Sequence, residues 1–368
     1  MQVKSARSIK ILTIISIGTL AVSAISALAF STVSASINKI DAFAGLKNRP
    51  SKASSAVNYL LVGSDTREGL TKEELKLLRV GSVKSAAGKR SDTMLLIHIS
   101  KARDKAVIIS IPRDTFALIP EHKNNQGKLV PAVHSKINSA FNWGGAPLLI
   151  QVVEEMTNLK IDHYVEVNFA GFADVVDALG GIEVCTKRDI NDAKSHLVLP
   201  AGVHTLNGIE ALKYVRTRDF DGLGDIGRMQ RQQAFIGSVL RKATSAGVLL
   251  NPVTMVNFIN SSLSAVTTDS GLKSADLITL AKQMKSLSAA KVRTLTVPLS
   301  DLSYSSDGVT GAVLWDPVLA PDLWQRIKED RAVIDEVTPS PSPSATTTSA
   351  PTIIDKFKTK TAEDNTCK

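Results

Sequence analysis

The chain has 368 residues with 44 Lys and Arg against 35 Asp and Glu, so it carries a net charge of +9 when its histidines are neutral. Hydrophobic residues make up 43% and charged residues 21%, which excludes a wholly disordered chain. Two cysteines, Cys185 and Cys367, are too few for a disulfide scaffold or a thiolate zinc site, and the 6 histidines show no short helical pair that would favour a metal.

The N-terminus carries a long apolar run. Residues 11–38 are uncharged and follow three basic residues, and their most apolar part can cross about 30 Å of hydrocarbon as a helix. The basic flank predicts a cytoplasmic segment at 1–10, a transmembrane helix at 11–35 and the remaining chain outside the cell. A cleaved signal peptide is the alternative, because 27–29 (ALA) resembles a cleavage site, although the run is long for one. We therefore expect a single-pass cell-membrane protein with an extracytoplasmic domain.

The rest of the chain divides by composition. Residues 36–56 are small, basic and Pro-containing, and we expect them to form a linker. Residues 338–368 begin with a run rich in Pro, Ser and Thr, and we expect a disordered tail. The folded domain is therefore predicted at 57–337. Its basic excess favours anionic lipids, polymers or phosphates as partners, and a location outside the membrane argues against nucleic acid.

Strand and helix patterns alternate along this domain. Short β-branched runs predict strands at 57–62, 93–99, 106–111, 163–167, 181–185 and 292–297. Helical spacing of apolar residues predicts helices at 147–157, 169–179, 208–214, 226–246, 257–263, 274–287 and 317–334. The mixture predicts an α/β domain with helices on both faces of a sheet, and the short 99–105 connection makes part of that sheet antiparallel.

The ends of three predicted strands each carry an acid next to a base. Charged turns are common, so each pair alone is equally compatible with a solvated ion pair. Their repetition at neighbouring strand ends favours one shared cleft. The pairs are Asp65 with Arg67, Arg90 with Asp92, and Arg113 with Asp114.

A basic stretch follows the helix predicted at 208–214. Arg216 and Arg218 share a face if the segment is extended, and Arg228 and Gln232 are i, i+4 neighbours in the first turns of the next helix. Arginines gathered at a helix N-terminus suit phosphate oxygens, because the guanidinium group offers a planar pair of donors. The alternative is a solvated basic helix face, which we favour only for Arg231, since it lies off the face of Arg228 and Gln232.

One motif in this region is misleading. Residues 222–227 fit the G-x-G-x-x-G pattern, but no buried strand precedes them and no acidic residue follows at the required distance. The sequence also contains no P-loop motif and no G-x-S-x-G elbow. Dinucleotide binding, P-loop hydrolysis and α/β-hydrolase chemistry are therefore disfavoured.

Eight sequence blocks, taken in order, show a resemblance to a known family. They are 61–67 (LVGSDTR), 90–93 (RSDT), 111–114 (IPRD), 136–140 (KINSA), 179–182 (LGGI), 206–212 (LNGIEAL), 215–218 (VRTR) and 225–233 (DIGRMQRQQ). With the N-terminal apolar run, they resemble the LytR-CpsA-Psr family over about residues 57–245. The resemblance implies a three-layer α-β-α sandwich with a central mixed sheet, preceded by one transmembrane helix, and a long apolar pocket for a lipid.

The resemblance also implies an activity. Members of this family transfer a glycopolymer from a polyprenyl-pyrophosphate carrier onto peptidoglycan in cell-wall biogenesis, with Mg²⁺ or Mn²⁺. By this resemblance Asp65 and Asp92 hold the metal. The pyrophosphate is expected to contact Arg90, Arg113, Arg216, Arg218, Arg228 and Gln232, with Asp65, Arg90, Asp92 and Arg113 at the catalytic centre.

Several alternatives stay open at this point. Asp65 or Asp114 could take the proton of the acceptor hydroxyl. The domain could instead be a polyprenyl-pyrophosphate phosphatase, or a non-catalytic lipid-pyrophosphate binder or regulator. Cys185 lies in a predicted apolar strand, where we expect a buried thiol, and Cys367 is expected to be free.

Overall fold

The computed structural model describes residues 38–67, 70–78, 91–124, 126–218, 222, 224–243, 265–273, 276, 289–337 and 352–361, with the backbone alone at 92, 225, 226, 243, 289, 337, 352 and 353. The predicted cytoplasmic segment and transmembrane helix lie outside these residues, as do the helix predicted at 257–263 and almost all of that predicted at 274–287. Among the helices of the described residues, none is both long and apolar enough to cross a bilayer.

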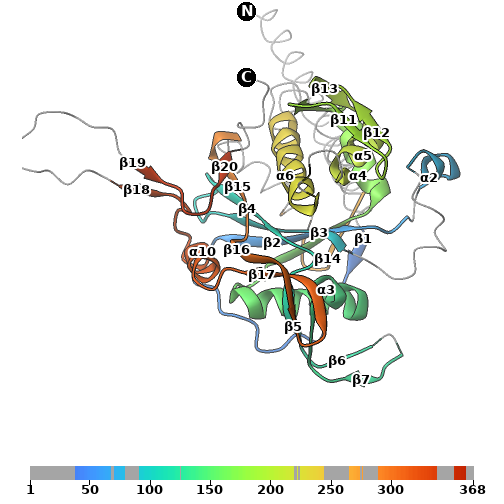
Figure 1. Cartoon of the computed structure of the whole chain (residues 1–368). Coiled ribbons are helices and arrows are strands. Elements are labelled where there is room, and N and C mark those ends of the chain that lie inside the picture. The colour runs from blue at the N-terminus through green and yellow to red at the C-terminus, as the bar shows by residue number, and fades with distance from the viewer. Residues whose placement is uncertain are drawn as a thin grey trace, which may run out of the picture.

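A mixed sheet of 8 strands forms the centre of the domain (Figure 1). β3 is antiparallel to both of its neighbours, whereas β9 is parallel to β2 and β15 is parallel to β4. In spatial order the strands are β1 (Asn38–Ile40), β14 (Val266–Asp269), β9 (His163–Val167), β2 (Val57–Ser64), β3 (Ser91–Ile99), β4 (Ala106–Ile111), β15 (Val292–Thr296) and β20 (Lys360–Thr361).

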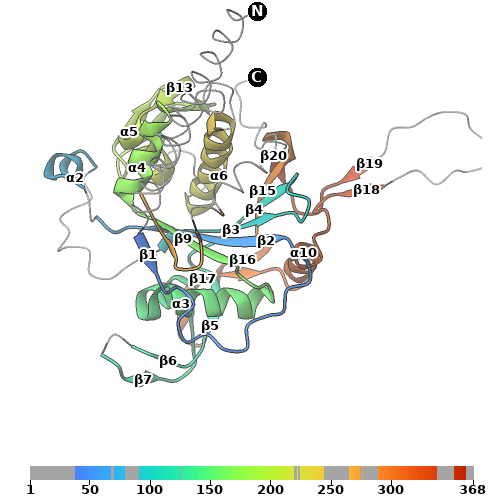
Figure 2. The same ribbon diagram turned by 180° about the vertical axis from the view of Figure 1, so that it is seen from behind.

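Helices cover both faces of this sheet, as Figures 1 and 2 show from opposite sides. One face carries α4 (Phe169–Ala178), α5 (Gly208–Arg216) and α6 (Gly224–Ala243). The other carries α3 (Asn138–Thr157) and α10 (Leu319–Lys328). The predicted α/β sandwich with a central mixed sheet is therefore confirmed.

The two faces follow from the strand pattern. Successive side chains of a strand point to opposite faces of the sheet, so an uninterrupted apolar strand supplies two cores. On β3, Met94 and Leu96 pack in the core shared with α3 and α10, whereas Leu95 packs in a smaller cluster with Ile236 of α6. This explains why the central strands could be predicted to within two residues of their observed ends.

Short antiparallel pairs lie outside the central sheet. These are β5 (Phe116–Ile119) with β8 (Val133–Lys136), β6 (His122–Lys123) with β7 (Leu129–Val130), β10 (Ile182–Thr186) with β13 (Gly202–Leu206), β11 (Ile190–Asp192) with β12 (Leu197–Leu199), β16 (Leu299–Ser306) with β17 (Val309–Trp315), and β18 (Asp335–Val337) with β19 (Thr352–Ile354). A short helix, α2 (Lys72–Leu78), precedes β3.

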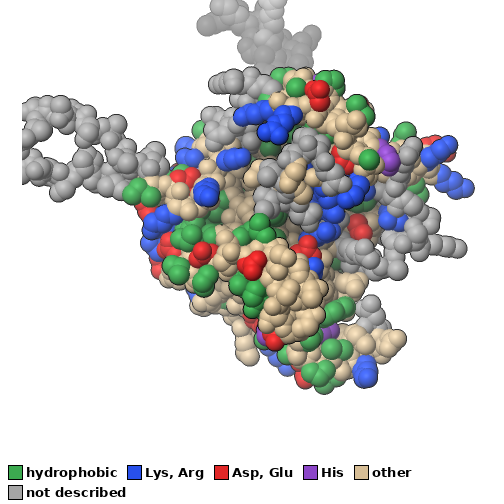
Figure 3. Space-filling view, in the orientation of Figure 1, with side chains coloured by type: hydrophobic (Ala, Val, Ile, Leu, Met, Phe, Trp, Pro, Cys, Tyr) green, Lys and Arg blue, Asp and Glu red, His purple; other side chains and the backbone are tan. Residues whose placement is uncertain are grey.

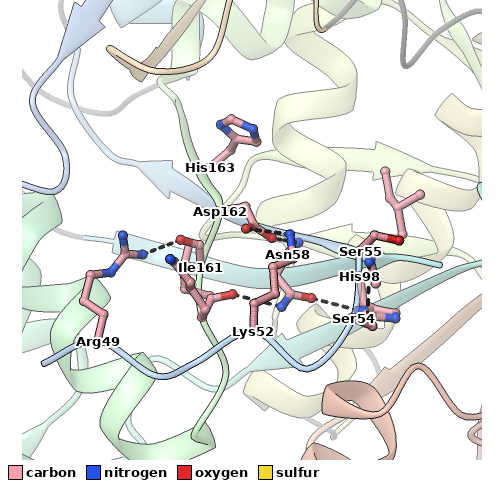
Figure 4. Close-up of polar contacts among 12 residues, drawn as sticks. Arg49, Lys52, Ser54, Ser55, Asn58, His98, Ile161, Asp162 and His163 are labelled. Carbon is pink, nitrogen blue, oxygen red and sulfur yellow. Dashed lines mark hydrogen bonds and ion pairs between the residues drawn. The ribbon is translucent and has the colours of Figure 1, made fainter. Parts of the chain in front are cut away.

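The described part of the predicted linker packs against the domain. β1 pairs with β14, and the Arg49 guanidinium binds the buried Glu154 carboxylate with Nη2–Oε1 at 2.7 Å. Lys52 contacts Asp162 at 2.8 Å, close to where Asp162 accepts the backbone N–H of Asn58 (Figure 4). Residues 38–56 of the linker predicted at 36–56 thus pack against the domain, because charges spaced along them meet partners that are distant in the sequence.

Figure 4 also shows His98 beside Asn58, in the same polar group. One ring nitrogen of His98 lies 2.8 Å from Asn58 Oδ1, and the other lies 3.1 Å from Asp330 Oδ1, at the end of α10. Burial holds the pKa of His98 below its usual value, and the neighbouring Asp330 acts in the opposite direction. These contacts join α10 to the sheet at the edge opposite the candidate site described below.

The C-terminal segment differs from expectation in two respects. Residues 352–361 were expected in a disordered tail, yet β20 extends the central sheet beside β15 and Phe357 packs in the main core with 6% exposure. Cys185, on β10, is half-buried and disulfide-bonded, so the expected buried thiol is wrong. β20 and Phe357 have no local sequence signal, because the strand and the core that they contact lie far from them in the chain. Cys367 lies outside the described residues.

Candidate functional site

Polar segments converge on one edge of the central sheet. Gly63, near the end of β2, lies opposite Val167 at the end of β9 and opposite Thr93 at the start of β3. β4 ends at the same edge, because Ile111 pairs with Met94. The end of β2, the start of β3 and the end of β4 therefore lie at one edge of the sheet.

A β-bulge shapes this edge at Asp92. The register between β2 and β3 passes from Gly63 opposite Thr93 to Ser64 opposite Ser91, so Asp92 is the extra residue. A bulge re-aims a strand locally and is common beside active sites. The backbone of Asp92 thus lies across from Ser64, one residue before Asp65. The side chain of Asp92 and the whole of Arg90 lie outside the described residues.

A large apolar cavity lies between the sheet and α4, α5 and α6. Its volume is about 580 Å³, which is within the usual range for small-molecule sites. The sheet contributes apolar side chains from β2, β3 and β9, and the helices contribute aromatic and aliphatic side chains. Representative lining residues are Leu61, Ile97, Val165, Phe172, Phe235 and Ile236.

Basic and amide side chains gather at one end of this cavity. Four of the residues predicted to bind pyrophosphate line it together, and Lys194 joins them. They are Arg216, Arg218, Arg228 and Gln232. Figure 3 shows Lys and Arg side chains concentrated on the same upper half of the molecule, around the α6 layer. The cavity therefore combines an apolar interior with a cationic end, which suits an amphiphilic anion.

α5 and the turn after it place Arg216 and Arg218. The helix begins with a capping box between Asn207 and Glu210. It continues to Arg216, two residues beyond its predicted end, so Arg216 lies in the last helical turn and not in an extended segment. The Arg216 guanidinium lies over the Phe169 ring, 5.2 Å from its centroid. Arg218 follows an extended Thr217, so the two arginines leave the helix end in succession.

The buried carboxylate of Asp192 links the turn after β11 to the segment that carries Arg218. Asp192 is 1% exposed and accepts the backbone N–H of Arg218 at 2.5 Å. Its other oxygen accepts the N–H groups of Lys194 and Ser195, each at 2.8 Å. Asp192 therefore holds Lys194 and Arg218 at the same end of the cavity. Asp192 and Lys194 could not be predicted as site residues, because a turn-forming Asp gives no sign of its distant partner in the sequence.

α6 is fastened over the sheet edge by side chains of its first turns. Gln233 donates to Ser110 Oγ at 2.9 Å and to Thr296 Oγ1 at 3.0 Å. Arg231 is 8% exposed and donates to the Thr217 carbonyl at 2.5 Å, so the expected solvated surface residue is instead a structural one. Arg228, 4% exposed, is thereby held against the cavity.

A second cavity of about 270 Å³ begins on the far side of Arg228 and Gln232. Both residues line the two cavities in common, as do Thr93 and Leu95. Arg113 lines only the second cavity, so the structure separates it from Arg216 and Arg218. Arg113 lies 3.4 Å from Asp114, which also contacts Lys136 at 3.3 Å.

The two predicted metal ligands, Asp65 and Asp92, lie near each other by backbone position at this edge of the sheet. No group of three or more His, Cys, Asp or Glu side chains that could hold a metal occurs among them. Asp65 is a half-buried residue at the active edge, and Asp92 is adjacent to it by backbone register. Oxygen donors of this kind suit Mg²⁺, which commonly uses one or two carboxylates together with substrate phosphates.

Comparison with known proteins identifies similar sequences. The LytR_cpsA_psr family matches residues 24–317. The probable cell wall biosynthesis protein LcpB of Corynebacterium glutamicum is 35% identical over 274 residues, covering 74% of this chain and 61% of LcpB. TagT of Bacillus subtilis, a polyisoprenyl-teichoic acid–peptidoglycan teichoic acid transferase, is 36% identical over 202 residues, covering 53% and 55%. The chain thus spans less than two thirds of these relatives' length.

Solved structures share the fold. Protein gbs0355 of Streptococcus agalactiae has a TM-score of 0.61 at 26% identity, covering 75% of this chain and 88% of gbs0355. TagT bound to LI-WTA has a TM-score of 0.54 at 25% identity, covering 80% and 98%. The family match extends over well more than half of the chain and through every sequence block of the candidate site. The chain is therefore a member of the LytR-CpsA-Psr family.

Proposed function

We propose that this chain transfers a glycopolymer from a polyprenyl-pyrophosphate carrier onto peptidoglycan in cell-wall biogenesis. The observation that carries the proposal is the 580 Å³ apolar cavity with Lys194, Arg216, Arg218 and Arg228 at one end. A polyprenyl chain is wholly apolar and its pyrophosphate is strongly anionic, so the two ends of the ligand match the two ends of the cavity. The activity named for TagT further supports the proposal.

The chemistry is a phosphoryl transfer. A hydroxyl oxygen of the acceptor attacks the phosphorus that carries the glycan, and the bond from this phosphorus to polyprenyl phosphate breaks. The hydroxyl proton passes to a carboxylate, and polyprenyl phosphate departs with the electron pair. Such reactions depend on alignment and charge neutralisation, which guanidinium groups supply through paired N–H donors. Arg216, Arg218, Arg228 and Gln232 are assigned to the pyrophosphate oxygens, together with Arg90 and Arg113.

Asp65 and Asp92 are the residues that would hold Mg²⁺ or Mn²⁺. Their oxygen donors and adjacent backbone positions fit a hard cation that completes its coordination with phosphate oxygens and water. When bound, the cation would neutralise charge on the transferred phosphoryl group.

The membrane location proposed from the sequence agrees with a lipid-linked substrate. Residues 11–35 would anchor the chain in the cell membrane, where the polyprenyl carrier resides, and the domain would face peptidoglycan outside it. The short distance in sequence from the anchor to β1 would keep the cavity close to the bilayer.

Binding of geranylgeranyl pyrophosphate tests the proposed function. Ile236→Trp places a larger ring in the apolar cavity and should raise the dissociation constant at least about tenfold, because about 1.4 kcal/mol of lost apolar burial has that effect. Val203→Trp, at a 56% exposed position on β13, is the matched control. Calorimetric titration measures affinity, and thermal unfolding verifies the fold. Failure of the unaltered chain to bind, or equal affinity in the folded Ile236→Trp variant, would contradict the proposal.

A further inference from the structure

The second cavity lies where an attacking group would be needed. Phosphoryl transfer places the attacking and leaving oxygens roughly in line on opposite sides of phosphorus. In the proposed function the leaving polyprenyl phosphate occupies the large cavity, and the pyrophosphate lies at Arg228 and Gln232. These two residues also line the second cavity, which opens on their other side. The attacking oxygen would therefore approach from the second cavity.

The walls of the second cavity come from two segments that are joined to each other. Pro112, Arg113 and Asp114 form one side, and Leu302 and Val313 of the β16–β17 hairpin form the other. The Val313 backbone N–H donates to the Asp114 carbonyl at 2.8 Å, and Thr115 pairs with Val313 in a β-bridge. Trp315 Nε1 donates to Thr115 Oγ1 at 3.2 Å. The hairpin thus holds a fixed position relative to Asp114.

Aromatic rings continue this wall away from the sheet edge. The Phe116 ring stacks on His134 with centroids 4.8 Å apart, and it meets the Tyr304 ring edge-on at 5.1 Å. Phe116 follows Asp114 by two residues, and Tyr304 belongs to β16. Figure 3 shows mainly uncharged polar, apolar and acidic side chains around this hairpin, whereas Lys and Arg side chains are more frequent on the half above it. His134 also contacts the Asp307 carboxylate at 2.8 Å. Aromatic rings beside carboxylate and hydroxyl groups suit the faces and hydroxyls of a sugar chain.

We propose that the second cavity binds the acceptor glycan, with the attacking sugar hydroxyl at Asp114 and the β16–β17 hairpin as the acceptor wall. The inference rests on the proposed function and adds the acceptor subsite. The sugar O–H gives its proton to the Asp114 carboxylate as the new O–P bond forms and the P–O bond to polyprenyl phosphate breaks. Arg113 and Lys136, at 3.4 and 3.3 Å, hold that carboxylate in place.

The first test separates acceptor binding from donor binding. Leu302 is 53% exposed, so Leu302→Glu should leave the fold intact while placing an uncompensated charge at the cavity wall. Leu129→Glu changes an equally exposed leucine, at 54%, on β7 and outside both cavities. The ligands are a peptide-free peptidoglycan tetrasaccharide and geranylgeranyl-pyrophosphoryl N-acetylglucosamine. Leu302→Glu should weaken tetrasaccharide binding at least about tenfold and leave donor affinity within about twofold, and Leu129→Glu should change neither.

The second test concerns Asp114 itself. Asp114→Asn should leave both affinities within about twofold but lower the rate of transfer about 100-fold or more, as expected for loss of a positioned base. Unchanged transfer in this variant would overturn the role of Asp114. Unchanged tetrasaccharide binding in Leu302→Glu, or an equal loss in Leu129→Glu, would overturn the acceptor subsite while donor binding stood. Absence of donor binding by the unaltered chain would instead refute the proposed function.

Discussion

Arg228→Lys is expected to weaken binding of geranylgeranyl pyrophosphate by roughly ten- to a hundredfold, with little change in thermal stability. Arg228 is 4% exposed and lines both cavities, so its guanidinium group lies where the pyrophosphate is proposed. Lysine keeps the charge but replaces a planar pair of donors by a point charge on a flexible stem. Loss of a charged hydrogen bond costs about 1.5–3 kcal/mol, which corresponds to that range of affinity.

The control for this variant is Arg188→Lys. Arg188 is an exposed arginine in the turn between β10 and β11 and lines neither cavity. Calorimetric titration of the same ligand into the three proteins gives the comparison. Equal affinities would mean that Arg228 is a packing residue, and the pyrophosphate assignment at the cationic end would fail. Arg231→Lys is unsuitable as a control, because Arg231 holds the Thr217 carbonyl.

Asp65→Asn is expected to raise the Mg²⁺ concentration needed for half-maximal transfer by roughly 10- to 100-fold or more. Loss of a residue that only hydrogen-bonds a metal ligand already weakens metal binding by about that factor, and Asp65 is proposed as a ligand itself. Asp65 follows the end of β2 and is half-buried, so the substitution should not disturb the core. The amide keeps the shape of the carboxylate and removes its charge. The measurement is the rate of transfer as a function of Mg²⁺, with thermal unfolding as the check on folding.

Glu183→Gln is the matched control for Asp65→Asn. Glu183 is an exposed carboxylate on β10, away from the sheet edge that carries Asp65. It should leave the Mg²⁺ dependence unchanged. If Asp65→Asn has the same Mg²⁺ dependence as the unaltered chain, then Asp65 is not a metal ligand and the proposed metal pair with Asp92 is wrong.

The central strands and most of the cationic end could be predicted because their signals are local. β4 and β9 match their predicted ranges, since apolar β-branched runs buried on both faces leave a continuous pattern. The cationic end could be predicted because Arg216, Arg218, Arg228 and Gln232 follow closely in one stretch. Arg113 was assigned to the same end, yet it lies on the other side of Arg228, a distinction that depends on the packing of α6.

The β16–β17 hairpin could not be predicted from its residues. It is rich in Ser and Gly and mostly exposed, and register shifts interrupt its pairing, so it lacks the alternation that marks a strand. Asp192 was missed for a different reason. Its partners, the backbone N–H groups of Lys194, Ser195 and Arg218, become visible only once the chain is folded. The hairpin and the role of Asp192 could therefore not be predicted, because both depend on contacts between segments that are distant in the sequence.

A crystal structure of the full chain with geranylgeranyl pyrophosphate is the most direct test of the account. We expect the prenyl chain to lie between β2, β3, β9 and helices α4 and α6, in contact with Phe172 and Ile236. We expect pyrophosphate oxygens within hydrogen-bond distance of Arg218 and Arg228. A prenyl chain bound outside this cavity, or a pyrophosphate that contacts neither arginine, would contradict the central claim.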